Sequence, residues 1–492
     1  MANLNKQILS GVLWNTIQLV INRGFSFIIK LVLARLLFPE DFGVVGMATV
    51  FISFVTVFND LGIGAALVQK KEEDLNELHY YTSFWTGVGW SIALYIIISL
   101  FVGPLAADFY DEEILESLIP VLSLGILSSP INLVHKAQLT KALDFKKIAF
   151  ITNVSSIFSG VLALILAYLG AGVWSLVFNS VASIVIGIPL YFRATAWVPK
   201  FKWGKEEFKD IFGFGVYTTG TNVFNNLISK LDYLVIGKMM SASVLGVYTL
   251  AFILTDTFRS QLMAVMNKVM YPVYGRMQDN KNSLKIYYLK VVGYNSLIVY
   301  PIMVFLLILG GPFVNQFFGD KWDGTILPLQ ILSVSVMFHM MVNSNTSLIR
   351  GLGKPKLEMK LQIVKALFLY MPLIIAGTYY YGIVGAASAI LINKIISVFI
   401  AQYFLKKLVN ISFSELLNSL KAPLIGSLIA GIVSYTLYEY TILHYILIGV
   451  ILAIVYLGVV YLLMRRELTE LYWKLKNNYG KKNKKKDLHP SE

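Results

Sequence analysis

Long apolar stretches recur from one end of this chain to the other, and they limit the folds that are open to it. Fourteen of them, each 19–27 residues long, can be marked along the 492 residues. An α-helix rises about 1.5 Å per residue, so each stretch can cross the roughly 30 Å hydrocarbon core of a bilayer. Their continuous hydrophobicity differs from the every-second-residue alternation of a membrane barrel. The sequence therefore predicts an all-α integral membrane protein with about fourteen transmembrane helices. The predicted spans are 11–37, 42–68, 79–103, 114–139, 148–169, 171–192, 211–237, 242–268, 284–310, 326–350, 358–380, 383–405, 420–438 and 442–464.

The charges between the spans predict the orientation of the chain. Of the 42 lysines and arginines, thirty-two lie in one alternating set of loops and in the tail 465–492. The opposite loops hold three, namely Arg35, Lys238 and Lys321. Cytoplasmic loops carry the excess of lysine and arginine, so we expect both termini in the cytoplasm. The net charge of +14 is mostly this topology signal, and the basic tail is expected near anionic lipid or simply in solution.

An internal repeat predicts two halves. Residues 10–37 align with 214–240, and 42–51 align with 245–252 after a one-residue slip. The copies lie six spans apart, so both have the same topology, an arrangement common in secondary transporters. We expect two parallel six-helix bundles followed by two further helices and a tail. The corresponding ranges are 1–210, 211–410, 411–464 and 465–492.

Polar residues interrupt the first span at helical spacing. Asn22 and Lys30 lie on one stripe, together with Asn15, Gln18 and Ser26, and Arg23 lies beside it. Cations within a membrane helix are costly and rarely face lipid, so this stripe predicts a watery cavity that holds a substrate. The alternative is a network of amides that joins neighbouring helices.

The seventh span copies this pattern. Asn222 and Asn226 share a face, and Lys230 and Asp232 lie near the outer end. We expect this stripe to line the same cleft as the first.

Two further spans contribute candidates. Asp256 and Arg259 lie three residues apart in the eighth span, where they either neutralise each other or leave Arg259 free. Arg23 and Arg259 are predicted at similar depth, and a pair of guanidiniums suits an anionic head group. In the tenth span His339 and Asn343 share a face. We interpret His339 as structural, with a role in handling protons or sugar hydroxyls as the alternative.

Several chemistries are disfavoured. The chain has no cysteine, its five histidines lack metal-ligand spacing, and it contains no nucleotide-binding loop. We expect no catalytic residues, no metal, no cofactor and no nucleic-acid partner. A coupling ion, H⁺ or Na⁺, is compatible with the sequence, which does not identify it. No outward loop exceeds about fifteen residues, which leaves little room for an outer catalytic domain.

The motifs LARLLFPEDFGVVGMATVF (33–51), DLGIGAALVQKK (60–71), LDYLVIGK (231–238), LGVYTLAF (245–252) and MYPVYGRMQDN (270–280) resemble a family. Together they look like the Wzx-type polysaccharide exporters, in the branch of the colanic-acid and teichuronic-acid exporters. The resemblance runs over nearly the whole chain in the right order. It implies the fold of the multidrug/oligosaccharidyl-lipid/polysaccharide superfamily, with two bundles that form a V-shaped cleft.

The resemblance also implies a function. The expected substrate is an undecaprenyl-diphosphate-linked sugar repeat unit, moved from the inner to the outer leaflet of the bacterial cytoplasmic membrane. Polysaccharide polymerase and assembly proteins are the implied partners. Related lipid II flippases carry arginines in their first and eighth helices, which correspond to the helices of Arg23 and Arg259. Their last two helices form a groove for the lipid tail, as the spans 420–438 and 442–464 would here.

Two alternatives remain open at this stage. A drug or cation antiporter of the same superfamily would need an acidic cavity, whereas the first and seventh spans bring three cations against Asp232. A membrane glycan polymerase or ligase would need a large outward loop, which this chain lacks.

Overall fold

All the secondary structure that the structure describes is helical. The computed structural model describes residues 21–59, 63–212 and 216–465, so residues 11–20 of the span predicted at 11–37 lie outside the description, as does most of the tail. No strand occurs in these three ranges. The prediction of an all-α protein is confirmed.

The chain divides into two compact units. The first unit comprises residues 1–250 and two later segments, Phe317–Thr325 and Ile374–Ala386. The second unit comprises Ala251–Gln316, Ile326–Leu373 and Ala387–Glu492. These units are defined by contacts, whereas the predicted halves are defined by the sequence repeat. The boundary between the halves near residue 210 stays a prediction.

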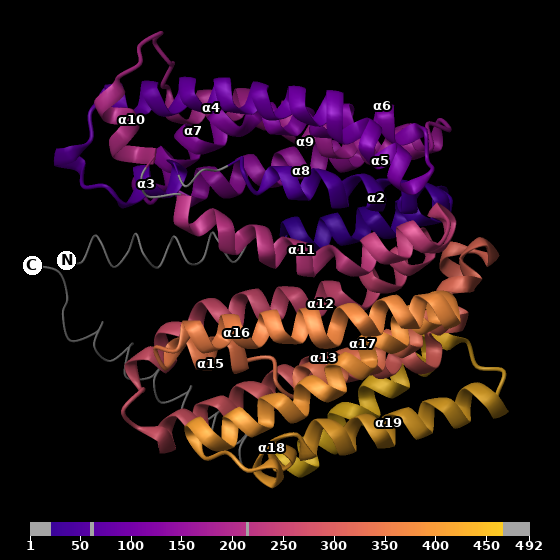
Figure 1. Ribbon diagram of the computed structural model, residues 1–492. Helices are drawn as coiled ribbons and strands as arrows, with labels where there is room; N and C mark the ends of the chain where they lie inside the picture. Colours follow the sequence, from indigo (N-terminus) through magenta and orange to yellow (C-terminus); the bar gives the residue numbers. More distant parts are fainter. Residues whose placement is uncertain (1–20, 60–62, 213–215, 466–492) are drawn as a thin grey trace, which may run out of the picture. The chain divides into compact units, whose positions relative to one another are not determined.

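The first described helix of the first unit covers residues 21–36, and further helices pack beside one another in this unit (Figure 1). Within the unit the most extensive packing joins α8 to α9 and α4 to α7. Its helices are α2 (Pro39–Thr56), α3 (Ile63–Gln69), η1 (Glu72–Asp74), α4 (Glu77–Ile97), η2 (Ile98–Val102), α5 (Gly103–Tyr110), α6 (Ile114–Ser123), η3 (Leu124–Ser128), α7 (Ser129–Lys141), α8 (Phe145–Tyr168), α9 (Val173–Thr195), α10 (Lys205–Phe212), α11 (Val216–Met239), the start of α12 (Ala242–Arg276) and η4 (Asp320–Thr325).

The second unit contains the longest helices of the chain. Its elements are the rest of α12, α13 (Lys281–Phe318), α14 (Ile326–Met340), α15 (Asn345–Gly351), α16 (Pro355–Lys365), η5 (Ala366–Tyr370), α17 (Met371–Val409), α18 (Phe413–Ser419), α19 (Lys421–Tyr440) and a last helix, Tyr445–Arg465. Among them, η5 is a π-helical turn, as is η2 in the first unit. Segments of α12, α13 and α17 belong to the first unit.

The helix boundaries follow local sequence signals. Pro39 occupies the first turn of α2, where its missing N–H costs nothing. The Asn76 side chain accepts a hydrogen bond from the His79 backbone N–H at 3.0 Å and so caps α4. The spans predicted at 358–380 and 383–405 meet at Gly382, whose φ of 56° is open to glycine at little cost.

Ten segments are long and apolar enough to cross a membrane, counted over the described residues. The run Pro355–Val409 covers two of the predicted spans, which accounts for part of the difference from fourteen. The helices α11 and α12 have the required length, but are not among the ten. The protein is thus a multi-pass membrane protein, and the number fourteen stays a prediction.

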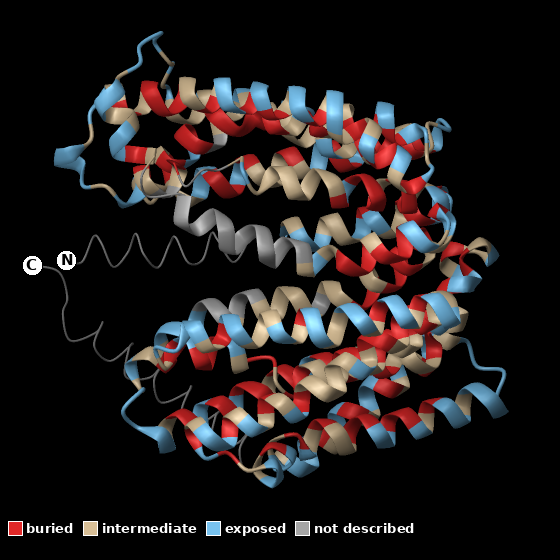
Figure 2. Ribbon diagram, in the orientation of Figure 1, coloured by how far each residue is buried: buried red, intermediate tan, exposed pale blue. Residues whose placement is uncertain are grey.

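Apolar side chains also cover the outside of the helices. Figure 2 shows exposed residues along the outside of α19. On this helix Leu428 and Ile432 are exposed, whereas Ala430 is buried. On the last helix Ile454 and Leu457 are exposed to the same extent, 64% each. A soluble protein rarely exposes apolar surface so widely, whereas a bilayer solvates it.

Candidate functional site

Cations gather on the helix 21–36 of the first unit. Arg23 and Lys30 are seven residues apart, which places them two turns apart on one face, and both are exposed. Arg23 and the Lys230 side chain of α11 lie near enough to Lys30 to repel its charge. The structure therefore groups three of the predicted site residues, which we call the first cation cluster: Arg23, Lys30 and Lys230.

The Asn22 side chain contacts the helix α8. Its Nδ2 donates hydrogen bonds to the Ser156 hydroxyl at 2.5 Å and to the Thr152 carbonyl at 3.5 Å, both on α8. This contact fits the alternative interpretation of the stripe, in which an amide joins two helices.

Asp232 is engaged inside the first unit. It is only 4% exposed. Its Oδ2 accepts a hydrogen bond from the Tyr248 hydroxyl at 2.7 Å, and its Oδ1 accepts one from the Tyr233 backbone N–H at 3.0 Å. A buried carboxylate needs such donors, so this residue ties α11 to the first turns of α12.

The second unit holds another cation group. The charges of Arg259, Lys365 and Lys394 act on His339 of α14, so the three cations lie in its neighbourhood. We call these four residues the second cation cluster. Within this cluster the Asp256 Oδ1 accepts a hydrogen bond from the Arg259 Nε at 2.7 Å. Of the two alternatives predicted for this pair, the structure therefore shows the one in which Asp256 and Arg259 neutralise each other.

Lys365 and Lys394 are not among the site residues predicted from the sequence. Lys365 is the last residue of α16 and directly precedes the π-helical turn η5. Single π-helical turns inside helices frequently mark functional sites, but their position is not visible in the hydrophobic pattern.

The structure describes fewer contacts for the remaining predicted site residues. Asn343 is 4% exposed, and its Oδ1 has no hydrogen-bond partner in the described part of the chain. Asn222 and Asn226 lie on α11, but their side chains are outside the description.

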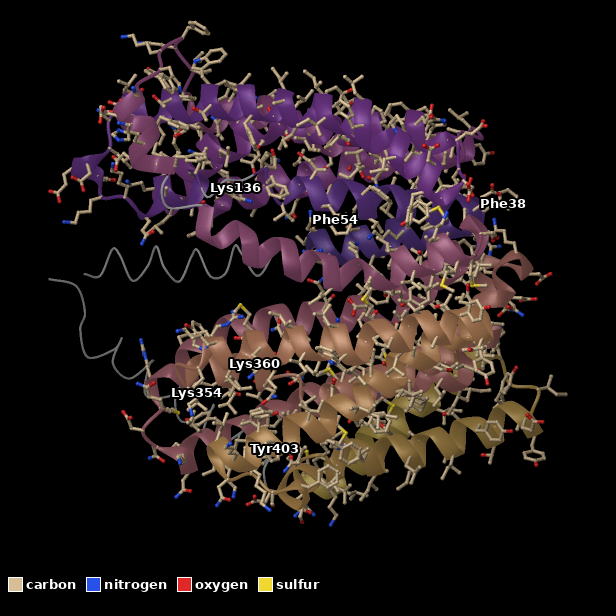
Figure 3. All side chains as sticks on the ribbon, viewed as in Figure 1. Phe38, Phe54, Lys136, Lys354, Lys360 and Tyr403 are labelled. Atoms are coloured by element: carbon tan, nitrogen blue, oxygen red, sulfur yellow. The ribbon has the colours of Figure 1, made fainter. Side chains whose placement is uncertain are left out.

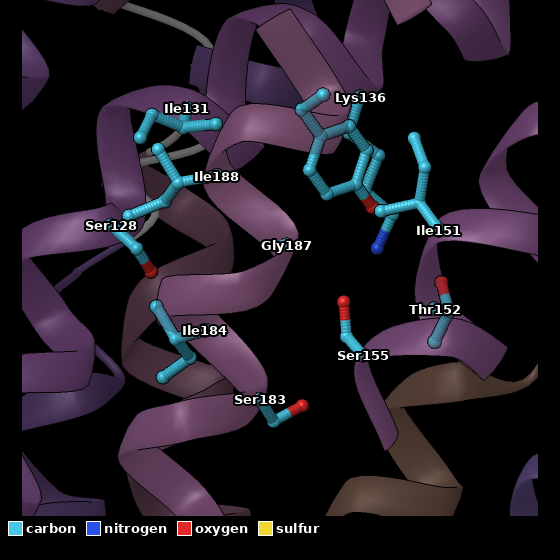
Figure 4. Close-up of a pocket in the computed structure, with 11 residues that line it drawn as sticks. Ser128, Ile131, Lys136, Ile151, Thr152, Ser155, Ser183, Ile184, Gly187 and Ile188 are labelled. Carbon is cyan, nitrogen blue, oxygen red and sulfur yellow. The ribbon is translucent and has the colours of Figure 1, made fainter. Parts of the chain in front are cut away.

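A cavity lies within the first unit, between α7, α8 and α9 (Figure 4). Its volume is about 210 Å³. The amine of Lys136 and the hydroxyl of Ser155 are both directed into it. A second cavity of about 710 Å³ shares Ser128 and Lys136 with the first. Lys136 is not among the site residues predicted from the sequence, because spacing along one helix does not reveal a cavity between three helices.

An all-helical, multi-pass protein with cations inside its spans has the architecture of a membrane transporter. Solved structures carry the same fold. The lipid II flippase MurJ, in an inward closed conformation, gives a TM-score of 0.72 at 15% identity, covering 93% of this chain and 100% of that one. An inward-facing multidrug resistance MATE transporter of the MOP superfamily gives 0.62 at 16% identity, covering 83% and 99%.

The chain belongs to the polysaccharide biosynthesis protein family, whose sequence profile matches residues 32–327. It is 26% identical to the lipopolysaccharide biosynthesis protein WzxC of Escherichia coli K12 over 442 residues, 88% of each chain. It is 24% identical to the teichuronic acid biosynthesis protein TuaB of Bacillus subtilis 168, covering 88% of this chain and 90% of that one. The resemblance noted in the sequence is confirmed.

Proposed function

We propose that this protein is a flippase that moves a diphosphate-linked oligosaccharide across the bacterial cytoplasmic membrane. The substrate is an undecaprenyl-diphosphate-linked repeat unit, which passes from the inner to the outer leaflet by alternating access. A polysaccharide polymerase and its assembly proteins then use the repeat unit on the outer side. Both termini remain in the cytoplasm, in line with the distribution of lysine and arginine.

The second cation cluster is the observation that carries this proposal. Three cations, Arg259, Lys365 and Lys394, lie close enough to His339 for their charges to act on it, and the Arg259 guanidinium binds Asp256. A group of cations of this kind suits a doubly charged diphosphate. Arginine binds it through a bidentate fork and lysine as a point charge.

The same contacts argue against a cation antiporter. That function needs a carboxylate that is free to bind the cation. Of the two predicted carboxylates, Asp232 accepts hydrogen bonds from Tyr248 and Tyr233, and Asp256 is paired with Arg259. A role as a glycan-processing enzyme is disfavoured by the short outward loops of the predicted topology.

Deletion of the gene tests the proposal. We expect loss of the surface glycan and accumulation of lipid-linked intermediates, both reversed by the wild-type chain. Lys365→Ala should fail to reverse them at normal membrane levels, whereas the control Lys360→Ala, on the same helix α16 (Figure 3), should succeed. A deletion strain that keeps its glycan and accumulates no intermediate would contradict the function.

A further inference from the structure

The segment 197–204, which connects α9 to α10, combines apolar and basic side chains on an exposed surface. Its sequence is WVPKFKWG, in which Lys200 and Lys202 alternate with aromatic residues and no acidic residue occurs. Val198 is 70% exposed and Phe201 is 88% exposed. Exposed apolar side chains that lie together mark a surface for contact with a protein or a membrane.

This segment is held against the outer side of α4. The Trp85 Nε1 donates a hydrogen bond to the Lys200 carbonyl at 2.8 Å. The Trp203 Nε1 donates one to the Thr86 hydroxyl at 3.1 Å. The Phe201 ring packs edge-on against the Trp85 ring, with 4.9 Å between the ring centroids. Figure 1 shows the segment projecting beside α4 and α10, away from the other helices of the first unit.

These contacts place the segment at a particular depth along α4. The apolar run that contains this helix is Glu77–Tyr110, whose 34 residues extend over about 51 Å. The hydrocarbon core of a bilayer is about 30 Å thick, so a centred run extends about 10 Å beyond the core at each end. Trp85 and Thr86 lie eight and nine residues after Glu77, which is about 12–14 Å along the helix. The segment therefore lies where the lipid head groups meet the hydrocarbon.

The side chains of the segment suit this depth. Aromatic rings are enriched at the boundary between membrane and water, as at Phe201 and Trp203. A lysine carries its charge at the end of an apolar stem, so Lys200 and Lys202 can reach lipid phosphates while their stems stay beside the rings. Basic residues at a cytoplasmic membrane surface are attracted by its anionic lipids.

We propose that residues 198–203 bind the lipid surface on the predicted cytoplasmic side of the membrane. Val198 and Phe201 lie among the lipid chains, and Lys200 and Lys202 bind the head groups of anionic phospholipids. The proposed function does not include this partner, and the contact does not depend on the sugar that is exported. Because the segment connects the two predicted halves, the contact keeps their connection at the membrane surface.

The test measures which lipid lies beside the segment in the purified full-length protein. The native chain has no cysteine, so Val198→Cys can carry a single bimane fluorophore. The protein is placed in vesicles of phosphatidylcholine and phosphatidylglycerol, and one of the two lipids bears a nitroxide quencher at the top of its acyl chain. We expect labelled phosphatidylglycerol to reach half-maximal quenching at an about tenfold lower fraction than labelled phosphatidylcholine, since each lysine favours an anionic lipid by up to about fivefold.

Variants of the lysines test their part in this preference. Lys200→Gln together with Lys202→Gln should remove it, and the corresponding pair of arginines should keep it. Each single glutamine should remove part of it, which keeps the test decisive if the double variant does not fold. The matched control, Lys146→Gln with Lys147→Gln, removes two exposed lysines of α8 and should leave the preference unchanged. The melting temperature of each variant shows whether it is folded.

Two further labelled positions serve as references. Glu73→Cys, in the exposed turn η1, should be quenched by aqueous iodide and by neither lipid. Phe158→Cys, on the outside of α8 where the native ring is 62% exposed, should be quenched equally by the two lipids.

Quenching of the label at position 198 by iodide and by neither lipid would place the segment in water and overturn the proposal. Equal quenching by the two lipids in the otherwise wild-type protein would also overturn it, because the lysines would then bind no anionic head group. A preference that persists in the folded double glutamine variant would overturn it for the same reason.

Discussion

The α-carbon of Gly43 packs directly against the backbone carbonyl of Ala242. A Cβ at Gly43 would lie 1.7 Å from the Ala242 oxygen. The contact recurs with the roles exchanged, because a Cβ at Gly246 would lie 1.6 Å from the Pro39 oxygen. Both pairs lie in the first unit, and Gly43 and Gly246 differ by the offset that aligns 42–51 with 245–252. Repeat-equivalent residues thus interlock the first turns of α2 and α12.

Alanine at either glycine should break this interlock. The clash is with backbone, which cannot rotate away, so Gly43→Ala and Gly246→Ala should each cost about 1–3 kcal/mol or more. Thermal unfolding of the purified variants measures this. The matched control is Gly46→Ala on the same helix, whose added Cβ would meet the Tyr233 ring at an ordinary 3.4 Å. Because the two contacts lie in the same crossing of α2 and α12, the double variant should lose less stability than the sum of the two single variants. Wild-type stability in both single variants would contradict the interlock.

The contacts of Gly43 and Gly246 separate what can be predicted from the sequence from what cannot. The repeat identified Gly43 and Gly246 as equivalent, since an offset is visible in one dimension. It gave no sign that each touches the other copy's first turn, which depends on how two helices cross. The long apolar runs likewise predicted the all-α membrane fold, because span length and polarity are local properties.

The faces of the helices were harder to predict, for a physical reason. A helix in a bundle meets several neighbours, so a polar stripe does not show which one each residue meets. Asn22 belongs to the same stripe as Lys30, yet it contacts Ser156 of α8. Lys365 and Lys394 are not among the predicted site residues, because one cation in an apolar run has no periodicity of its own.

Arg23 should be required for export. Its guanidinium lies in the first cation cluster and is exposed. Arg23→Ala should abolish accumulation of the surface glycan at normal protein levels, and Arg23→Lys should restore it only in part, because lysine lacks the bidentate fork. Quantification of the glycan beside a membrane immunoblot measures both. Full export by Arg23→Ala would assign this residue a structural role.

Arg259 and Asp256 allow a stricter test. If Arg259 binds the diphosphate, Arg259→Ala should lose export, whereas Asp256→Asn should keep it, since the asparagine leaves the cation in place. If the pair only supports folding, each single variant should lower the protein level and the double variant should restore it. Protein level and export are scored together in the deletion strain.

The orientation of the chain can be tested with single cysteines, because the native chain has none. Lys200→Cys, in the loop predicted to be cytoplasmic, should resist impermeant thiol reagents in intact cells. Asp320→Cys, in a loop predicted to be outside, should react. Both positions are exposed, so the contrast reports sidedness. Labelling of Lys200→Cys from outside would reverse the proposed orientation.

The last two helices pack onto α13. The Tyr456 hydroxyl donates a hydrogen bond to the Leu297 carbonyl at 2.8 Å, and Gly431 lies against Val304. Gly431→Asn should therefore lower the melting temperature, because the larger polar side chain has no room beside Val304. Val450 of the last helix is 51% exposed, so its side chain lies on the outer face of that helix. Val450→Asn should fold normally, and loss of export in that variant alone would support a lipid-tail groove on these helices. Normal export in Val450→Asn would count against it.

Glu415 should make the stability of the second unit depend on pH. Its carboxylate binds the Lys285 ammonium and accepts two hydrogen bonds of 2.9 Å from the N–H and hydroxyl of Ser412. The hydrogen bond from Lys285, followed by those from Ser412, lowers the pKa of Glu415 from 4.5 to about 2. A carboxylate whose pKa is lowered on folding stabilises the protein at pH values above its unfolded pKa, and that contribution disappears as the pH falls through its folded pKa.

Glu415→Gln should thus lower the melting temperature at pH 7, and the wild-type and variant curves should converge between about pH 4.5 and pH 2. The exposed Glu439 serves as the control, since Glu439→Gln should change little at any pH. A difference between wild type and Glu415→Gln that persists unchanged at pH 2 would show that the missing charge is not its cause.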